Sequence, residues 1–106
     1  MKRILFICAR NQWRSPTAAR HFRNRPDCAV RSAGLSAKSP RQVSNADVDW
    51  ADLILVMEPE HKARLRERFR SLPLPPIYSL DIPDLYQRDD PELIALLEES
   101  VPPYLP

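Results

Sequence analysis

A cysteine and an arginine stand six positions apart near the start of the chain, in a segment whose residue types suit phosphate chemistry. Cys8 follows the apolar run at positions 4–7, and the segment ends with Arg14, Ser15 and Pro16. A loop that feeds a helix points unpaired backbone N–H groups and the positive end of the helix dipole at one spot. A phosphate bound there would be held by these amides and by two parallel hydrogen bonds from the guanidinium of Arg14. The same positive field favours the thiolate form of Cys8, which is a nucleophile that can attack phosphorus.

Cys8 also has a simpler interpretation, because an isolated cysteine at a strand end is usually a small buried apolar side chain. The catalytic interpretation is preferred, since Arg14, Ser15 and Pro16 all stand where a phosphate-binding loop needs them. The second cysteine, Cys28, begins the next predicted strand, whereas Cys8 ends the first one. Parallel strands of about five residues would hold the two cysteines roughly 15 Å apart, and a disulfide needs Cα atoms within about 7 Å. Cys28 is therefore predicted to be a thiol in the core.

Charge is distributed unevenly along the chain. The 106 residues carry 16 Lys and Arg against 14 Asp and Glu, which gives a net charge of +2. Residues 1–45 hold ten of the bases and one acid, and residues 46–106 hold six bases and thirteen acids. This polarity predicts an anionic ligand on the first half of the chain. A basic face that contacts only solvent is the alternative.

The composition disfavours several other classes of protein. No apolar stretch approaches the roughly 18 residues that a membrane span needs, and the apolar run after the first three residues is too short for a signal peptide. Two cysteines are too few for a disulfide framework, and neither Cys nor His shows the spacing of a zinc site. The expectation is a cytoplasmic protein with reduced thiols, no membrane contact, no metal and no cofactor.

Strand and helix patterns alternate along the chain. Four segments predict strands, at residues 4–7, 28–32, 52–57 and 77–80, and the first and third are continuous apolar runs typical of buried parallel strands. Helices are predicted to begin near residues 15, 59 and 91, with Ser15 and Asp90 as N-caps. Residues 35–49 are polar and are predicted to be a loop or a short helix. The sequence therefore predicts an α/β fold, a single domain over residues 1–106 with a doubly wound, four-stranded parallel sheet flanked by helices, and a phosphate loop between the first strand and the first helix.

The carboxyl ends of the strands in such a sheet share one rim, and ligands bind beyond it. Cys8 ends the first predicted strand, and Asp84 follows the fourth. Both residues are therefore expected at the same rim.

With these elements in place, the chain resembles the low-molecular-weight protein tyrosine phosphatases. The pattern Cys8-x5-Arg14-Ser15-Pro16 after an apolar strand looks like their phosphate loop. The resemblance continues over nearly the whole chain, through Ser32-Ala33-Gly34, residues 52–57, and Asp84-Leu85-Tyr86, where the family has Asp-Pro-Tyr. The chain is shorter than typical members, mostly between residues 35 and 50, and it looks closest to a short bacterial branch of predicted tyrosine phosphatases.

The resemblance implies roles for individual residues. Cys8 would attack phosphorus and form a phosphocysteine, while Arg14 and the amides of residues 9–14 would stabilise the equatorial oxygens. Ser15 would hydrogen-bond the sulfur of Cys8, and Asn11 would brace the loop. Asp84 would protonate the leaving oxygen and then activate water. The substrate-contacting set implied by the resemblance consists of Ala9, Arg10, Asn11, Gln12, Trp13, Ser15 and Tyr86.

The loop departs from the family pattern at three positions. Arg10 stands where the family usually has glycine, Gln12 where it has an apolar residue near the substrate, and Trp13 where many members carry a second cysteine. A loop that aims successive amides inward often needs a residue with positive φ. Asn11 can supply such a residue, because asparagine tolerates this conformation better than most side chains.

A second carboxylate competes for the role of the acid. Asp81 lies three residues before Asp84 and follows the fourth predicted strand more closely. Asp84 is preferred because it keeps the two-residue spacing to Tyr86, and Asp81 would then cap a turn.

The substrate stays open at the level of the sequence. By resemblance the default partner is a phosphotyrosine protein. A phosphatase for a nucleotide or RNA phosphate, and a non-catalytic phosphate- or nucleic-acid-binding module, are alternatives that the basic first half would suit. Nucleic acid is not favoured, since no nucleic-acid motif is present. Arsenate reduction, which the same fold performs, is less favoured because it needs further cysteines to relay a disulfide. The oligomeric state and the full activity of a loop without glycine are also undetermined.

Overall fold

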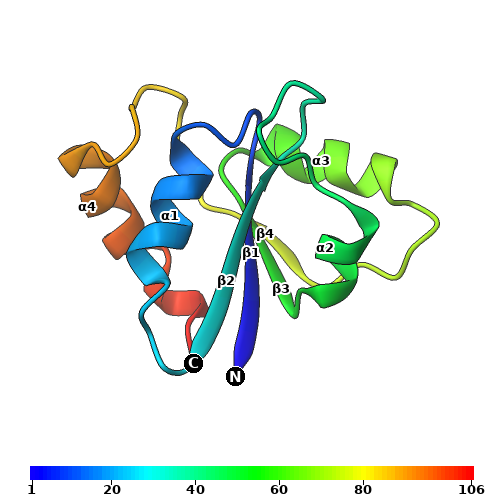
Figure 1. Ribbon diagram of the computed structural model, residues 1–106, viewed down its shortest axis with the longest axis horizontal. Helices are drawn as coiled ribbons and strands as arrows, with labels where there is room; N and C mark the ends of the chain where they lie inside the picture. Colours follow the sequence, from blue (N-terminus) through cyan, green and yellow to red (C-terminus); the bar gives the residue numbers. More distant parts are fainter.

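A parallel sheet of four strands lies between two layers of helices in the computed structural model, which describes all 106 residues (Figure 1). In chain order the elements are β1 (Lys2–Cys8), α1 (Arg14–Phe22), β2 (Cys28–Gly34), α2 (Asn45–Trp50), β3 (Leu53–Val56), α3 (Pro59–Arg68), β4 (Ile77–Ser79), α4 (Pro91–Ser100) and a short 3₁₀ helix, η1 (Pro102–Tyr104). The strands pair in the order β2-β1-β3-β4, all in parallel. This arrangement confirms the predicted doubly wound α/β fold.

The strand order reverses next to β1, so the loops that follow β1 and β3 lead to opposite sides of the sheet. The chain passes from β1 to β2 on one side of the sheet and later from β3 to β4 on the other. Right-handed crossovers therefore put α1 on one face, and α2 and α3 on the opposite face. Ligands of open α/β sheets bind at the carboxyl ends of the strands where such a reversal occurs. Cys8, the last residue of β1, lies at this point.

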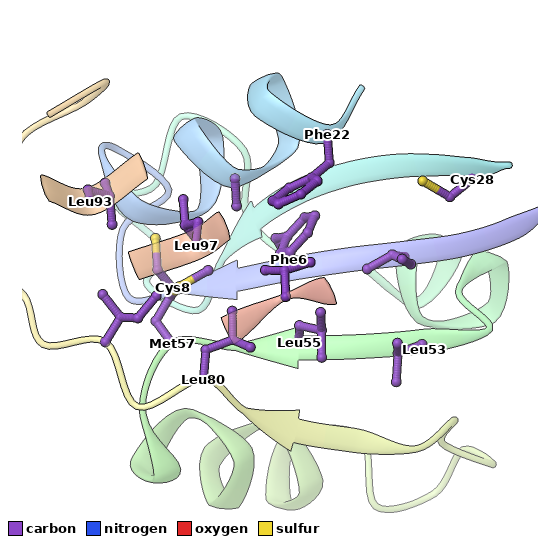
Figure 2. Packing of buried hydrophobic residues seen from close by; sticks show 14 residues of the cluster. Phe6, Cys8, Phe22, Cys28, Leu53, Leu55, Met57, Leu80, Leu93 and Leu97 are labelled. Atoms are coloured by element: carbon purple, nitrogen blue, oxygen red, sulfur yellow. The ribbon is translucent and has the colours of Figure 1, made fainter. Parts of the chain in front are cut away.

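Alternate residues of β1 pack against opposite layers of helices. Ile4, Phe6 and Cys8 belong to a cluster that includes Phe22 of α1 and Leu97 of α4 (Figure 2). The opposite face has its own cluster, whose members from β1, α2 and α3 include Leu5, Ile7, Val48 and Leu65. Burying one such large side chain contributes about 1.5–3 kcal/mol to folding. The strand that carries the cysteine is therefore anchored on both faces.

The register between β1 and β2 separates the two cysteines. Cys28 pairs with Lys2, and Cys8 pairs with Gly34, so the cysteines lie at opposite ends of neighbouring strands (Figure 2). At about 3.3 Å per residue the separation is roughly 20 Å. Both are buried free thiols, which confirms Cys28 as a core residue.

The predicted role of Ser15 as an N-cap is wrong. Helix α1 begins one residue earlier, at Arg14, and Trp13 occupies the N-cap position without a side-chain cap. The side chain of Ser15 is fully buried and lies next to the sulfur of Cys8. Tertiary contact with the sulfur has thus displaced the local capping pattern.

Other helix starts follow their local sequence. Asp90 accepts a hydrogen bond from the N–H of Glu92 at the start of α4, as predicted. The polar segment at residues 35–49 contains the start of α2, where Ser44 and Asp47 form a reciprocal capping box. None of the helices is long and apolar enough to cross a membrane.

Candidate active site

The sulfur of Cys8 is buried at the end of β1 and is contacted by one amide of the following loop and by one side chain from the first turn of α1. The backbone N–H of Asn11 donates to Cys8 Sγ over 3.2 Å, and Ser15 Oγ lies 3.0 Å from the same sulfur. Ser15 Oγ also lies 2.9 Å from Asn11 Oδ1. The serine hydroxyl has one hydrogen, so it donates either to the asparagine or to the sulfur. When the sulfur is a thiolate it can only accept, and the serine hydroxyl then donates its hydrogen bond to the sulfur.

Asn11 provides the turn that closes the loop. Its φ is 52°, in the left-handed region that asparagine tolerates. No other loop residue has a positive φ, so Arg10 needs none of the freedom that glycine has. The expectation that Asn11 supplies the positive φ is confirmed.

Most backbone N–H groups of the loop have no acceptor in the protein. Asn11 donates to the sulfur, but the other loop amides donate no hydrogen bond, namely those of Ala9, Arg10, Gln12, Trp13 and Arg14. The carbonyl groups of residues 8 and 9 are by contrast fixed, because they accept hydrogen bonds of 3.1 and 2.8 Å from the N–H groups of residues 35 and 36. Successive free donors on a fixed loop form a concavity that suits an anion.

Gly34 at the end of β2 allows the next segment to support the loop closely. A Cβ atom at this position would lie 2.1 Å from Ser39 Oγ and 2.9 Å from the carbonyl carbon of Arg10. Both separations are far shorter than van der Waals contact. Position 34 therefore requires glycine, because any side chain there would collide with Ser39 and with the backbone of Arg10.

Arg14 is buried, and one side of its guanidinium is held by the protein. Nη1 donates to Glu58 Oε2 over 2.9 Å and to Ile82 O over 2.7 Å, which uses both of its hydrogens. Nε and Nη2 make no hydrogen bond to the protein, although Asp84 Oδ1 lies 3.7 Å from Nε. This edge of the guanidinium is the one that can grip two oxygens of a phosphate.

Glu58 and His61 hold Arg14 in place, and the sequence analysis did not single out Glu58 or give His61 a role. The N–H of Glu58 donates to His61 Nδ1 over 3.2 Å, and His61 Nε2 lies 3.3 Å from Glu58 Oε2. Because Nδ1 accepts, the neutral imidazole carries its hydrogen on Nε2 and can donate it to the carboxylate. Burial, followed by the positive charge of Arg14, lowers the pKa of His61 below its usual value of 6.5. The only signal in the sequence was an acidic residue soon after a buried strand at the predicted rim.

The loop, Arg14 and Asp84 face one cavity of about 320 Å³. Its lining consists of residues 8–10, residues 12–14 and Asp84. Four of the predicted substrate-contacting residues are therefore in the lining, namely Ala9, Arg10, Gln12 and Trp13. Asn11 and Ser15 are buried around the sulfur. No group of three or more His, Cys, Asp or Glu side chains is arranged to hold a metal ion.

Two aromatic residues proposed to contact the substrate lie in different places. Trp13 lines the cavity, and 41% of it is exposed. Tyr86 does not line the cavity and packs, half-buried, against the hydrophobic cluster of α1 and α4. Trp13 is therefore the aromatic side chain that a substrate in this cavity would meet.

The two candidate acids also differ in position. Asp81 has a φ of 56°, and its Oδ1 accepts a hydrogen bond of 2.6 Å from Ser79 Oγ, so it forms a turn after β4. Asp84 lines the cavity, and its side chain is 59% exposed. Of the two, Asp84 is the one that can reach a group bound over Cys8.

Known proteins share both this fold and parts of this sequence. A protein-arginine-phosphatase of Geobacillus stearothermophilus is 32% identical in an alignment 91 positions long that covers 63% of this chain and 62% of the relative. The structure of the YwlE arginine phosphatase from the same organism matches with a TM-score of 0.69 and 26% identity, over 93% of this chain and 85% of that chain. SP-PTP, a low-molecular-weight protein tyrosine phosphatase from Streptococcus pyogenes, matches with a TM-score of 0.82 and 20% identity, over 98% of this chain and 91% of that chain. The chain is thus similar in sequence to a protein-arginine-phosphatase and shares its fold with a low-molecular-weight protein tyrosine phosphatase.

The chain spans 62% of the length of the arginine phosphatase that it matches in sequence. No family model matches the chain.

Proposed function

We propose that this protein is a phosphatase that removes phosphate from protein side chains through a phosphocysteine intermediate. One observation carries the proposal: the Cys8 sulfur, the unpaired loop amides and the free edge of Arg14 belong to one cavity. A phosphate in this cavity would accept hydrogen bonds from donors that have no other acceptor. Its phosphorus would then lie against the nucleophile.

In the first step the thiolate of Cys8 attacks phosphorus. A sulfur–phosphorus bond forms, and the bond from phosphorus to the leaving group breaks with its electron pair. The protonated carboxyl group of Asp84 gives its proton to the leaving atom. The loop amides and the Nε and Nη2 hydrogens of Arg14 stabilise the charge on the three equatorial oxygens.

In the second step water replaces the sulfur. Asp84, now a carboxylate, takes a proton from a water molecule whose oxygen attacks phosphorus. The sulfur–phosphorus bond breaks, inorganic phosphate leaves, and Cys8 returns as a thiolate. The hydroxyl of Ser15, 3.0 Å from the sulfur, stabilises that leaving thiolate by donating to it.

Phosphotyrosine is the default substrate residue, because Trp13 offers an aromatic wall beside the phosphate position. Phosphoarginine is the second candidate. Two similar proteins are named arginine phosphatases, and the exposed carboxylate of Asp84 at the cavity could pair with a guanidinium group.

Hydrolysis of para-nitrophenyl phosphate in the presence of EDTA tests the proposal. We expect no turnover by Cys8→Ser, a loss of about 10²–10³-fold in kcat for Arg14→Ala, and a loss of about 10²–10⁴-fold for Asp84→Asn. Asp81→Asn is the matched control for Asp84→Asn, because asparagine keeps the positive φ, and it should change kcat by less than about twofold. Mass spectrometry of acid-quenched enzyme should find one phosphoryl group on the peptide that contains Cys8.

Peptides that contain phosphotyrosine or phosphoarginine then separate the two substrate candidates by their kcat/KM values. Folded wild-type protein that binds inorganic phosphate but turns over none of the three substrates would contradict the proposed enzyme. In that case the protein would be a phosphate-binding module.

A further inference from the structure

A second cavity, lined by four arginines, lies along the outer side of α1. Its volume is about 390 Å³. Arg20 and Arg23 come from α1 and its C-cap, Arg31 comes from the edge strand β2, and Arg88 comes from the loop before α4. These four residues are called the arginine groove below. The groove has no lining residue in common with the cavity over Cys8.

The arginine groove is fastened to the catalytic loop. Arg88 Nε donates to the carbonyl of Gln12, a residue of the loop, over 3.0 Å. The next residue, Asp89, donates its N–H to Thr17 Oγ1 of α1 over 2.9 Å. Two contacts therefore hold the segment of Arg88 against the start of α1. The other N–H groups of the Arg88 guanidinium have no hydrogen-bond acceptor in the protein, and Arg88 lines the groove.

The charges of the groove are only partly neutralised. Arg20 pairs with Asp89 over 3.2 Å, and Arg31 pairs with Asp47 over 3.4 Å. Asp47 is also the partner of Arg41. Arg23 and Arg88 have no carboxylate within ion-pair distance. Arg31 lines the groove at the edge of β2, but its guanidinium points to the other face of the sheet, where it pairs with Asp47 and lies 4.3 Å from the centre of the Trp50 ring of α2. Three guanidinium groups, those of Arg20, Arg23 and Arg88, thus remain on the groove side with one carboxylate, Asp89.

We propose that the arginine groove binds anionic side chains of the protein substrate, either carboxylates or a second phosphate, next to the residue that is dephosphorylated. This inference rests on the proposed function. At 1.5 Å of helix rise per residue, Arg20 and Arg23 lie about 9–14 Å along α1 from Arg14. An extended peptide covers that distance in about three to four residues. The groove therefore selects an anionic group about three or four residues from the target residue.

The lining of the groove favours a peptide over a nucleic acid. Guanidinium groups pair well with carboxylates and with phosphates. The lining holds no aromatic side chain on which a base could stack, and its other members are Pro16, Ala19, Val30 and Ser32. Binding of single-stranded nucleic acid usually combines basic residues with such stacking platforms.

The experiment compares phosphopeptides that differ only in their flanks. Three peptides carry one phosphotyrosine, with glutamate, glutamine or phosphoserine at the third and fourth positions on both sides. The variants are Arg23→Glu and Arg23→Gln, and the matched control is Arg66→Glu. Arg66, an exposed residue in the last turn of α3, receives the same charge change on the opposite face of the sheet.

For the wild type we expect the acidic peptide to have a kcat/KM about three- to tenfold higher than the glutamine peptide, as two or three exposed ion pairs would give. The difference should lie in KM, and it should shrink as salt rises from about 50 to about 500 mM. Both Arg23 variants should lose this preference, and Arg66→Glu should keep it. The ratio between the glutamate and phosphoserine peptides identifies which anion the groove prefers.

Two controls separate this inference from the proposed function. Para-nitrophenyl phosphate hydrolysis measures the catalytic site alone, and anisotropy of a fluorescein-labelled, unphosphorylated glutamate peptide measures the groove alone. Loss of peptide binding in Arg23→Glu, with Arg66→Glu unaffected, would support the groove even without any turnover. Equal kcat/KM values for the acidic and glutamine peptides in an active wild type would overturn it. So would an equal loss in Arg66→Glu, or tight binding of an RNA oligonucleotide that depends on Arg23 while the peptides are not distinguished.

Discussion

Arginines serve two regions of this molecule in opposite ways. In the cavity over Cys8, which Arg10 and Arg14 both line, Arg14 is 2% exposed, and both hydrogens of its Nη1 are taken by protein acceptors. In the arginine groove the guanidinium groups of Arg20, Arg23 and Arg88 lie near the surface, and the ion pair of Arg20 with Asp89 joins groups that are 66% and 43% exposed. Water and salt screen the groove much more strongly than the cavity.

The difference follows from what each region has to do. A transition state gains from charges that are already oriented and cannot relax, which requires burial and fixed partners. Recognition of a flexible peptide gains from several adjustable charges, each of which contributes little. We therefore expect substitutions at Arg14 and its partners to have large effects, and those in the groove to have small ones.

The largest effect is expected for Arg14→Lys. An ammonium group is a point charge that cannot contact Glu58, the carbonyl of Ile82 and two phosphate oxygens together. The kcat/KM for para-nitrophenyl phosphate should fall by about 10²–10³-fold. Steady-state kinetics measure this loss, and calorimetry with inorganic phosphate reports ground-state binding. A loss below about tenfold would mean that a positive charge at position 14 is enough for activity and that the two-pronged geometry of the guanidinium is not needed.

Glu58→Gln should have the next largest effect. Glutamine can still accept a hydrogen bond from Arg14 but has no charge, and charge-assisted hydrogen bonds are about twice as strong as neutral ones. We expect kcat to fall about tenfold, equivalent to about 1.4 kcal/mol. Glu60→Gln, on the same helix but exposed, is the matched control and should leave kcat unchanged. Equal rates for the two variants would show that Glu58 does not position the guanidinium.

His61 predicts a pH dependence of stability. Its pKa is lowered in the folded protein, by burial first and then by Arg14, with Arg64 acting in the same sense and Glu58 and Glu60 opposing it. In the unfolded chain a histidine with a pKa near 6.5 binds more protons than the buried one, so the contribution of His61 to stability is present above pH 6.5 and is lost as the pH falls below it.

Urea denaturation of the wild type and His61→Asn between about pH 5 and pH 8 tests this dependence. The stability advantage of the wild type over the variant should decrease below pH 6.5, by at most about 1.4 kcal/mol per pH unit, the slope for one proton. The comparison cancels the contributions of all groups that the wild type and the variant have in common. Parallel stability curves would contradict the neutral state of His61.

The smallest effect is expected within the groove. A double-mutant cycle with Arg20→Gln and Asp89→Asn should give a coupling energy of about 0.2–1 kcal/mol. Asparagine tolerates the φ of 60° at position 89, so the cycle isolates the charge. Salt at about 0.5 M should remove most of this coupling. A coupling energy of several kcal/mol would contradict the prediction that ion pairs in the groove contribute much less than those around Arg14.

Much of the loop between Cys8 and Arg14 follows from the sequence because its parts are close along the chain. Cys8 and Arg14 lie in one loop between a strand and a helix, so alternation of apolar and polar segments was enough to place both. The positive φ of Asn11 and the cap at Asp90 are also local properties, and both agree with the prediction. The local pattern predicted Ser15 as an N-cap, and this prediction was wrong because the side chain of Ser15 contacts the Cys8 sulfur instead.

The arrangement of charge in space differs from the arrangement along the sequence more than any other feature does. Along the chain the basic residues gather in the first half and the acidic residues in the second, and this segregation led to the prediction that the first half binds an anionic ligand. In space, acids from the second half approach many of those bases, through the pairs Arg3–Asp52, Arg14–Glu58, Arg20–Asp89, Arg31–Asp47 and Arg41–Asp47. Net excess positive charge then concentrates in places such as the arginine groove, which no window of the sequence displays.

The sequence by itself determined the succession of strands and helices along the chain, the position of Cys8 at a strand end and the loop that can bind phosphate, because these depend on neighbours within a few residues. Only the tertiary structure decided that Glu58 and Ile82, 44 and 68 positions away, orient Arg14, and that Gly34 supports the loop. Such contacts arise where the carboxyl ends of parallel strands meet. They depend on which helix covers which face of the sheet and on the direction of each side chain, and a local sequence pattern predicts neither.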